Sequence, residues 1–297
     1  MEPTRLSEAR AAWERHGWCL LEACLPAEDL AGVPAALGHL FPTAAEMEEG
    51  ETDQTRRWRD WDAAWPEFPF RSATLNRLAL HDAVLDLAET LLGDDVRLYL
   101  ALVTAKFAGQ SSGYNRLLHA DYPNHMLVVP RAERGYQQLE LLIYLCDVSE
   151  ANGATHFLSV EATAEVPVER HTLDVAEYAQ CYEDDVAACG PSGSIAAYRP
   201  DVYHRSVDPD TKGFSRFLLH VSFRPAAAEW GGYQAWPFKG FSPEWHRFVA
   251  GAGPRQLGVL GFPRPGHPYW TEETLAGVGA RYPGLDLSPW REAAARS

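Results

Sequence analysis

The chain has 297 residues, of which 46% are hydrophobic and 23% are charged, which is typical of a globular protein with a large core. Its formal net charge of −15 argues against a nucleic-acid binder and against attachment to an anionic membrane, because both need clustered lysine and arginine. The five cysteines include no CxxC pair, which favours free thiols in a reducing compartment over a disulfide framework.

The first residues, "MEPTRLSEARAAWERHG", are charged and amphipathic and lack the apolar centre of a signal peptide. No stretch approaches the ~20 apolar residues that a membrane-spanning helix needs. We therefore expect a cytoplasmic protein whose partner is a small-molecule substrate. The sequence does not predict an oligomeric state.

The N-terminal part is predicted to be mainly helical. Helices are expected over residues 6–17, 26–40 and 72–93. The last of these has a clear amphipathic period and ends at Gly93, a residue that favours helix C-termini. "GWCLLEACL" (17–25) predicts a short strand. Residues 41–70 mix charged residues with tryptophan and have no clean period, which indicates a surface loop or lid with some helix.

After Gly93 the pattern changes to short segments of alternating hydrophobicity. Strands are expected over residues 95–109, 136–148 and 214–224, and within 189–204. The Asn152-Gly153 pair predicts a hairpin turn. This spacing predicts a mainly β fold with flanking helices, a sandwich or jelly roll. We expect one domain over residues 1–297, with a helical segment (1–93), a jelly-roll core (94–224) and a C-terminal segment (225–297) that wraps the surface.

The stretch "RLLHADYPNH" (116–125) contains the first candidate site. In a strand, residues i and i+2 point to the same side, so His119 and Asp121 can both bind one metal ion. Two imidazoles and one carboxylate on one face of an octahedron leave three positions open, which suits non-haem Fe(II) with a cosubstrate and O2. A structural zinc ion would more often have four protein ligands, usually including cysteine.

The third ligand must come from a later part of the chain. The candidates are His125, His156, His171, His204 and His220. We favour His204, which follows a predicted strand in "AAYRPDVYHRSVDP", and His220 is its rival. His125, Tyr122 and Tyr114 either line the pocket or pack in a loop. "RRWRDWDAAW" (56–65) is either an aromatic lid or a helix packed on the core.

The predicted strand over 214–224 has two unlike faces. Phe217, Leu219, Val221 and Phe223 share an apolar face, while Arg216, Leu218, His220 and Ser222 share the other. An arginine that faces the interior of a barrel needs an anion, because an unpaired buried charge is costly. That anion is either a dicarboxylate cosubstrate or a protein carboxylate.

His119-x-Asp121, His204-x-Ser206 and Arg216, in this order among short strands, resemble the phytanoyl-CoA dioxygenase family. These are Fe(II)- and 2-oxoglutarate-dependent oxygenases with a double-stranded β-helix (jelly-roll, cupin-like) core. Three longer stretches are also similar to the family: "HGWCLLEACLPAEDLAGV", "LNRLALHDAVLDLAETLLGDDVRLYLALVTAKF" and "LLIYLCDVSEANGAT". The resemblance spans about residues 7–224.

The resemblance implies that His119, Asp121 and His204 bind the iron. It also implies that Arg216 and Ser206 hold the distal carboxylate of 2-oxoglutarate, and that Lys106 contributes to the same pocket. Related halogenases lack the carboxylate that Asp121 supplies here. After the Asn-Gly turn, however, the chain has "HFLSVEAT" in place of the family's Pro-Gly-Ser-His run. Because that run borders the substrate pocket, the resemblance does not identify the substrate.

The implied activity is the hydroxylation of a small organic molecule, with O2 as oxidant and with conversion of 2-oxoglutarate to succinate and CO2. Desaturation, epoxidation or ring formation would use the same residues. The alternatives are a non-catalytic cupin-like metal protein and a small-molecule binding protein on the same fold. Consumption of 2-oxoglutarate distinguishes the enzyme from both.

Overall fold

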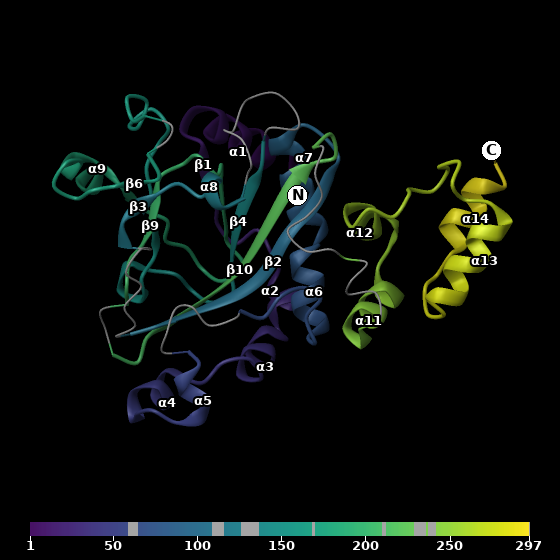
Figure 1. Ribbon diagram of the computed structural model, residues 1–297, viewed down its shortest axis with the longest axis horizontal. Helices are drawn as coiled ribbons and strands as arrows, with labels where there is room; N and C mark the ends of the chain where they lie inside the picture. Colours follow the sequence, from purple (N-terminus) through teal and green to yellow (C-terminus); the bar gives the residue numbers. More distant parts are fainter. Residues whose placement is uncertain are drawn as a thin grey trace.

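Two antiparallel sheets form the centre of the fold (Figure 1). The computed structural model describes residues 1–58, 65–108, 116–125, 137–167, 170–209, 212–228, 236 and 242–296. The five strands of the major sheet are, in spatial order, β1 (Trp18–Leu21), β8 (Ile195–Tyr198), β4 (Leu139–Tyr144), β10 (Ser215–Pro225) and β2 (Val96–Phe107). The five strands of the minor sheet are β6 (Thr172–Leu173), β3 (Leu118–His119), β9 (His204–Ser206), β5 (Thr155–Phe157) and β7 (Val186–Ala187).

Helices cover the outer face of the major sheet and continue into the C-terminal segment (Figure 1). Before the sheets come α1 (Pro3–His16), α2 (Ala27–Leu30), α3 (Val33–Gly38), α4 (Ala44–Glu49), α5 (Asp53–Arg56), α6 (Ala73–Ala79) and α7 (Asp82–Leu92). Between strands lie α8 (Tyr122–His125), a 3-10 turn (Glu150–Asn152) and α9 (Ala179–Asp184). The last helices are α11 (Pro243–Gly251), α12 (Pro254–Val259), α13 (Glu272–Arg281) and α14 (Ser288–Ala294).

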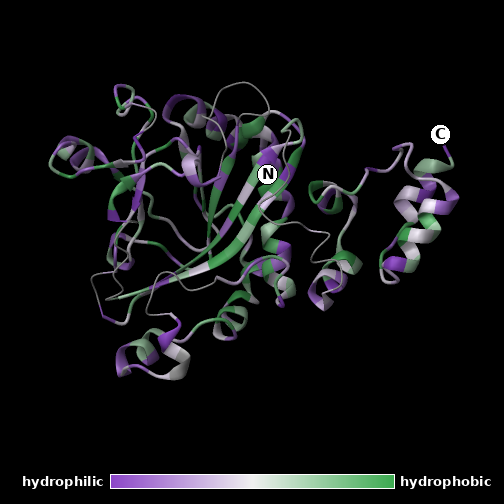
Figure 2. Cartoon of the chain, in the orientation of Figure 1, coloured by the Kyte–Doolittle hydropathy of each residue, from purple (hydrophilic) through white to green (hydrophobic). Residues whose placement is uncertain are grey.

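The two faces of β10 have the environments that its alternating sequence predicts. Leu219, Val221 and Phe223 are fully buried in the core that α7 covers. Arg216 and Ser222 are also buried, but they lie on the opposite face, which the minor sheet covers. Figure 2 shows hydrophobic residues concentrated along the central strands, whereas the peripheral helix α9 is mainly hydrophilic. The predicted jelly-roll class is therefore confirmed.

Two of the predicted helices are each divided in the structure. The segment 26–40 forms α2 and α3, because Pro34 lies in the first turn of a new helix rather than inside a continuous one. The segment 72–93 breaks at His81, whose Nδ1 accepts a hydrogen bond of 3.1 Å from the Ala83 backbone N–H and so caps α7. The amphipathic period continues across this break, which is why the sequence did not reveal it.

The predicted hairpin at Asn152-Gly153 is wrong. The 3-10 turn is present and Gly153 adopts a left-handed conformation (φ +81°), but the chain then passes from β4 in the major sheet to β5 in the minor sheet. A Cβ atom at Gly153 would lie 2.3 Å from the Val207 carbonyl oxygen, so this position requires glycine on two grounds. The turn thus connects the two layers that enclose the site.

The C-terminal segment contains short helices, as expected, and the tryptophans that the structure describes there are buried. Trp245, Trp270 and Trp290 belong to the same apolar cluster as the outer face of the major sheet, and Trp245 donates a 3.3 Å hydrogen bond to the Tyr282 hydroxyl. The division into segments 1–93, 94–224 and 225–297 stays a prediction. Residues 59–64, within the tryptophan-rich stretch, and Tyr114 lie outside the described residues. No helix within the described ranges is long and apolar enough to cross a membrane.

Candidate metal centre and cosubstrate pocket

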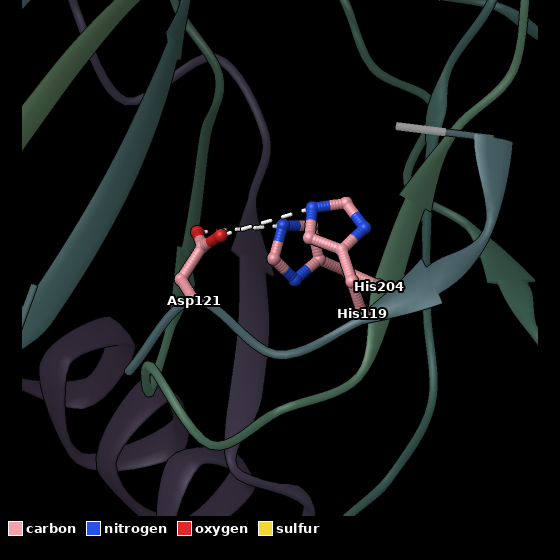
Figure 3. Close-up of side chains that lie close together, drawn as sticks. All are labelled: His119, Asp121 and His204. Atoms are coloured by element: carbon pink, nitrogen blue, oxygen red, sulfur yellow. Dashed lines mark ion pairs between the residues drawn. The ribbon is translucent and has the colours of Figure 1, made fainter. Parts of the chain in front are cut away.

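Three predicted ligands meet between the two sheets (Figure 3). His119 ends β3 and His204 begins β9, and the two residues are direct Cα partners across the antiparallel pair. The ligand atoms of His119, Asp121 and His204 all lie within 4.8 Å of one another. The Asp121 carboxylate is 3.7 Å from His119 Nε2 and 3.5 Å from His204 Nε2. This spacing allows one metal ion to bind all three side chains.

The backbone orients both imidazole rings toward this point. Nδ1 of His119 lies 2.8 Å from the Leu117 carbonyl oxygen, and Nδ1 of His204 lies 3.1 Å from the Val202 carbonyl oxygen. A carbonyl oxygen can only accept, so each Nδ1 must carry a proton and donate it. Each Nε2 then keeps its lone pair directed at Asp121. Metal-binding histidines in proteins are commonly held in this way.

The protonation states also suit a divalent cation. Burial lowers the pKa of His119 to about 4, and the neighbouring His204 acts in the same direction, so this imidazole is neutral at pH 7. Burial alone would raise the pKa of Asp121. The adjacent His204 and His119 outweigh it, with further help from the hydroxyl of Tyr198, and hold the pKa at about 2. A neutral imidazole and an ionised carboxylate are the forms that bind metal.

Tyr198 is a functional residue that the sequence analysis missed. It lies on β8 in the major sheet, and its hydroxyl donates a 2.9 Å hydrogen bond to Asp121 Oδ2. We expect Tyr198→Phe to weaken Fe(II) binding by about 10–100-fold, the usual effect of removing a hydrogen-bond partner of a ligand. The change should leave thermal unfolding nearly unchanged. Competition with a chromophoric chelator measures the affinity, and an affinity equal to wild type would contradict this role.

The other predicted site residues form a cationic cluster beside the metal centre. Arg216 on β10 and Lys106 on β2 are direct neighbours across the major sheet, and both are buried. Ser206, on β9 of the minor sheet, accepts hydrogen bonds from Lys106 Nζ at 2.8 Å and from Arg216 Nη2 at 3.1 Å. The structure therefore places Arg216, Lys106 and Ser206 together, two of them in one sheet and the third in the other.

Arg216 makes no ion pair with a protein carboxylate among the described residues. Its Nη1 donates to the Gly153 carbonyl oxygen and to Thr155 Oγ1, and its buried Nε has no partner. The carboxylate in this region is Asp208, which pairs with Lys106 at 2.6 Å and with Arg116. A buried guanidinium with an unused donor and only neutral partners fits an anionic ligand.

The remaining histidine candidates do not join the ligand group. His220 Nε2 lies 3.0 Å from Thr104 Oγ1, and burial lowers the pKa of its imidazole to about 3. His156 Nδ1 binds Asp185 at 2.7 Å. His171 lies next to β6 and His125 ends α8, and neither belongs to the three-residue cluster. The structure therefore favours His204 over its rivals.

Comparison with known proteins agrees with this arrangement. The family profile of phytanoyl-CoA dioxygenase (PhyH) matches residues 13–217. Among curated protein sequences, none matches this chain significantly.

Solved structures show the same fold at low sequence identity. The epimerase SnoN, in complex with Fe3+, alpha ketoglutarate and nogalamycin RO, is 19% identical over 82% of this chain and 91% of its own, with a TM-score of 0.54. EctD from S. alaskensis with bound Fe is 18% identical over 80% and 82% of the two chains, with a TM-score of 0.54. The carbocyclase SnoK from nogalamycin biosynthesis is 19% identical over 80% and 91%, with a TM-score of 0.55. Because the family profile covers more than half of its length, the chain belongs to the phytanoyl-CoA dioxygenase family.

Proposed function

We propose that this protein is an Fe(II)- and 2-oxoglutarate-dependent dioxygenase that hydroxylates a small organic substrate. The observation that carries the proposal is the convergence of His119, Asp121 and His204 on one point, with Arg216 nearby, whose buried Nε has no partner and which makes no ion pair among the described residues. Three protein ligands on one face leave room for a bidentate cosubstrate and O2.

The solved structures of similar fold support this reading. SnoN and EctD were crystallised with iron and with alpha ketoglutarate or 2-oxoglutarate. The outcomes in these similar structures differ, since SnoN is an epimerase and SnoK is a carbocyclase. We propose hydroxylation rather than halogenation because Asp121 supplies the carboxylate that related halogenases lack.

Each residue has a defined task in this proposal. His119, Asp121 and His204 would hold the iron, and Arg216, Ser206 and Lys106 would bind the distal carboxylate of 2-oxoglutarate. When bound, the iron supplies the activation of O2 and the coupled oxidative decarboxylation of 2-oxoglutarate. In the balanced reaction, a substrate C–H, O2 and 2-oxoglutarate give the alcohol, succinate and CO2. The protein's own contribution is to orient the reactants and to keep water away from them.

An anaerobic titration tests the proposal directly. Fe(II) and 2-oxoglutarate together should produce a weak visible charge-transfer band that neither component gives alone. Release of succinate then becomes the assay for substrates. A folded protein that forms no such band would instead favour the small-molecule binding protein as its function.

Lys106 predicts a pH dependence of cosubstrate affinity. Burial lowers the pKa of its ammonium group to about 8, with the nearby Arg216 acting in the same direction, while Asp208 opposes the shift. Lys106 is therefore protonated below pH 8 and loses its charge as the pH rises above that value. We expect the apparent affinity for 2-oxoglutarate to fall above about pH 8 as this charge is lost. In Lys106→Met the affinity should be lower but flat across this range, and a persistent fall would assign the titration to another group.

A further inference from the structure

Four buried polar side chains lie on the inner face of the major sheet, apart from the residues assigned above. They are Gln138, Glu140, Ser222 and Arg224, each at most 7% exposed. Glu140 lies on β4 and Ser222 on β10, and these strands run side by side with the two residues as direct partners (Figure 1). Polar groups buried in a sheet interior are costly, which calls for an explanation of this cluster.

The cluster adjoins the metal centre at the end away from Arg216. Glu140 is also the Cα partner of Tyr198, whose hydroxyl binds Asp121, so it lies directly beside a residue that touches the ligand set. Along β10, Ser222 is six residues from Arg216, or about 20 Å at the rise of a strand. The inner face thus has a cosubstrate end at Arg216 and a second polar end at Glu140.

The carboxylate of Glu140 has only neutral partners. Ser222 Oγ donates to one of its oxygens and Gln138 Nε2 to the other. Arg224 reaches it indirectly: its Nε donates to Gln138 Oε1 at 2.9 Å, and its guanidinium lies 4.0 Å from the centre of the Tyr99 ring. Within the described ranges Glu140 therefore has hydrogen bonds but no ion pair.

The environment of Glu140 thus resembles that of Arg216, although Glu140 is an acid and Arg216 is a base. Each is a buried ionisable group that is hydrogen-bonded to neutral groups and has no close ion pair among the described residues. Burial and the nearby Asp121 raise the pKa of Glu140, and Arg224 acts on it only from a distance. Nearby, the buried Nδ1 of His125 also has no hydrogen-bond partner. A ligand cation beside Glu140 would supply the ion pair that this end of the inner face lacks, as an anion would at Arg216.

We propose that Glu140 binds a basic nitrogen of the substrate, an amine or guanidine, and that the substrate is therefore a small polar base rather than an acyl chain. This inference rests on the proposed function, because it places the substrate next to the iron ligands. Gln138 and Ser222 are then positioning residues that hold the carboxylate in place by their hydrogen bonds.

The test measures binding by calorimetry to the anaerobic Fe(II)·2-oxoglutarate complex. The probes are agmatine, cadaverine and L-arginine, each compared with a counterpart that has no basic nitrogen: N-acetyl-N′-carbamoylputrescine, N,N′-diacetylcadaverine and N-acetyl-L-citrulline. Palmitoyl-CoA serves as the acyl-chain probe. The proteins are wild type, Glu140→Gln, which keeps the size and most hydrogen bonds of the side chain, and Glu161→Gln, which removes an exposed acid elsewhere.

We expect at least one basic probe to bind wild type and Glu161→Gln, and to bind Glu140→Gln about 30-fold or more weakly, as loss of one partner of a buried charge pair predicts. The preference of wild type for a basic probe over its counterpart tests the idea even without a variant. Binding of no basic probe, equal binding by Glu140→Gln, or tighter binding of palmitoyl-CoA would overturn the inference. If the charge-transfer band is missing in all three proteins before any probe is added, both the inference and the proposed function fail.

Discussion

In His204→Ala, Fe(II) binding should weaken by more than about 100-fold, because losing a ligand costs more than losing a partner of a ligand. The charge-transfer band with 2-oxoglutarate should disappear with it, and so should any succinate release. The physical reason is that, of the three candidate ligands among the described residues, only His119 and Asp121 would remain to hold the metal. Chelator competition and the anaerobic spectrum measure the two effects separately.

His156→Ala is the matched control for this variant. His156 is also a histidine of the minor sheet, on the strand β5 next to β9, but it pairs with Asp185 rather than with the ligand group. The control should keep both iron binding and the band. A band that survives in His204→Ala, or one that His156→Ala removes as completely, would show that the ligand set is wrong.

Replacing Arg216 by lysine should separate cosubstrate binding from iron binding. Lysine keeps the positive charge but loses the planar pair of donors that a carboxylate binds in a bidentate manner. We expect the affinity for 2-oxoglutarate to fall by at least about 30-fold, the lower range for breaking a buried charged hydrogen-bond pair. Chelator competition should show that Fe(II) affinity in the absence of 2-oxoglutarate stays close to wild type.

Thermal unfolding gives a second measure of the same effect. With the metal present, 2-oxoglutarate at 100 times its Kd should stabilise the wild-type protein by about 2.7 kcal/mol. The same concentration should stabilise Arg216→Lys far less. Arg264→Lys, a change to an exposed arginine paired with Asp95, should respond like wild type. Equal stabilisation of all three proteins would place the cosubstrate somewhere else.

The candidate site could be anticipated from the sequence where local periodicity determines side-chain direction. Alternation along 214–224 placed Arg216 and Ser222 on the inner face. His119 and Asp121 do converge, but β3 ends at His119 and Asp121 lies in the bend after it, so the expected strand does not explain their convergence. The order of motifs supplied His204. These inferences need only the alternation of side chains between the two faces of a strand, the short spacing of two ligands and a family resemblance.

The contacts between strands could not be anticipated, because one sequence does not say which strands become neighbours. Tyr198 reaches Asp121 from the other sheet, and Asp208 pairs with Lys106 from more than one hundred residues further along the chain. The hairpin prediction at Asn152-Gly153 failed for the same reason. The turn has the expected backbone, but the strands on either side of it have different partners.

The direct pairing of His119 with His204 has a consequence for how the protein can vary. Both residues lie on very short strands, so the ligand set depends on one register between β3 and β9. A slip of one residue would turn one imidazole to the other face of the sheet. A single-residue deletion between Tyr198 and His204 should therefore be far more damaging than most substitutions there. The chain between Tyr198 and His204 can thus vary in composition more freely than in length.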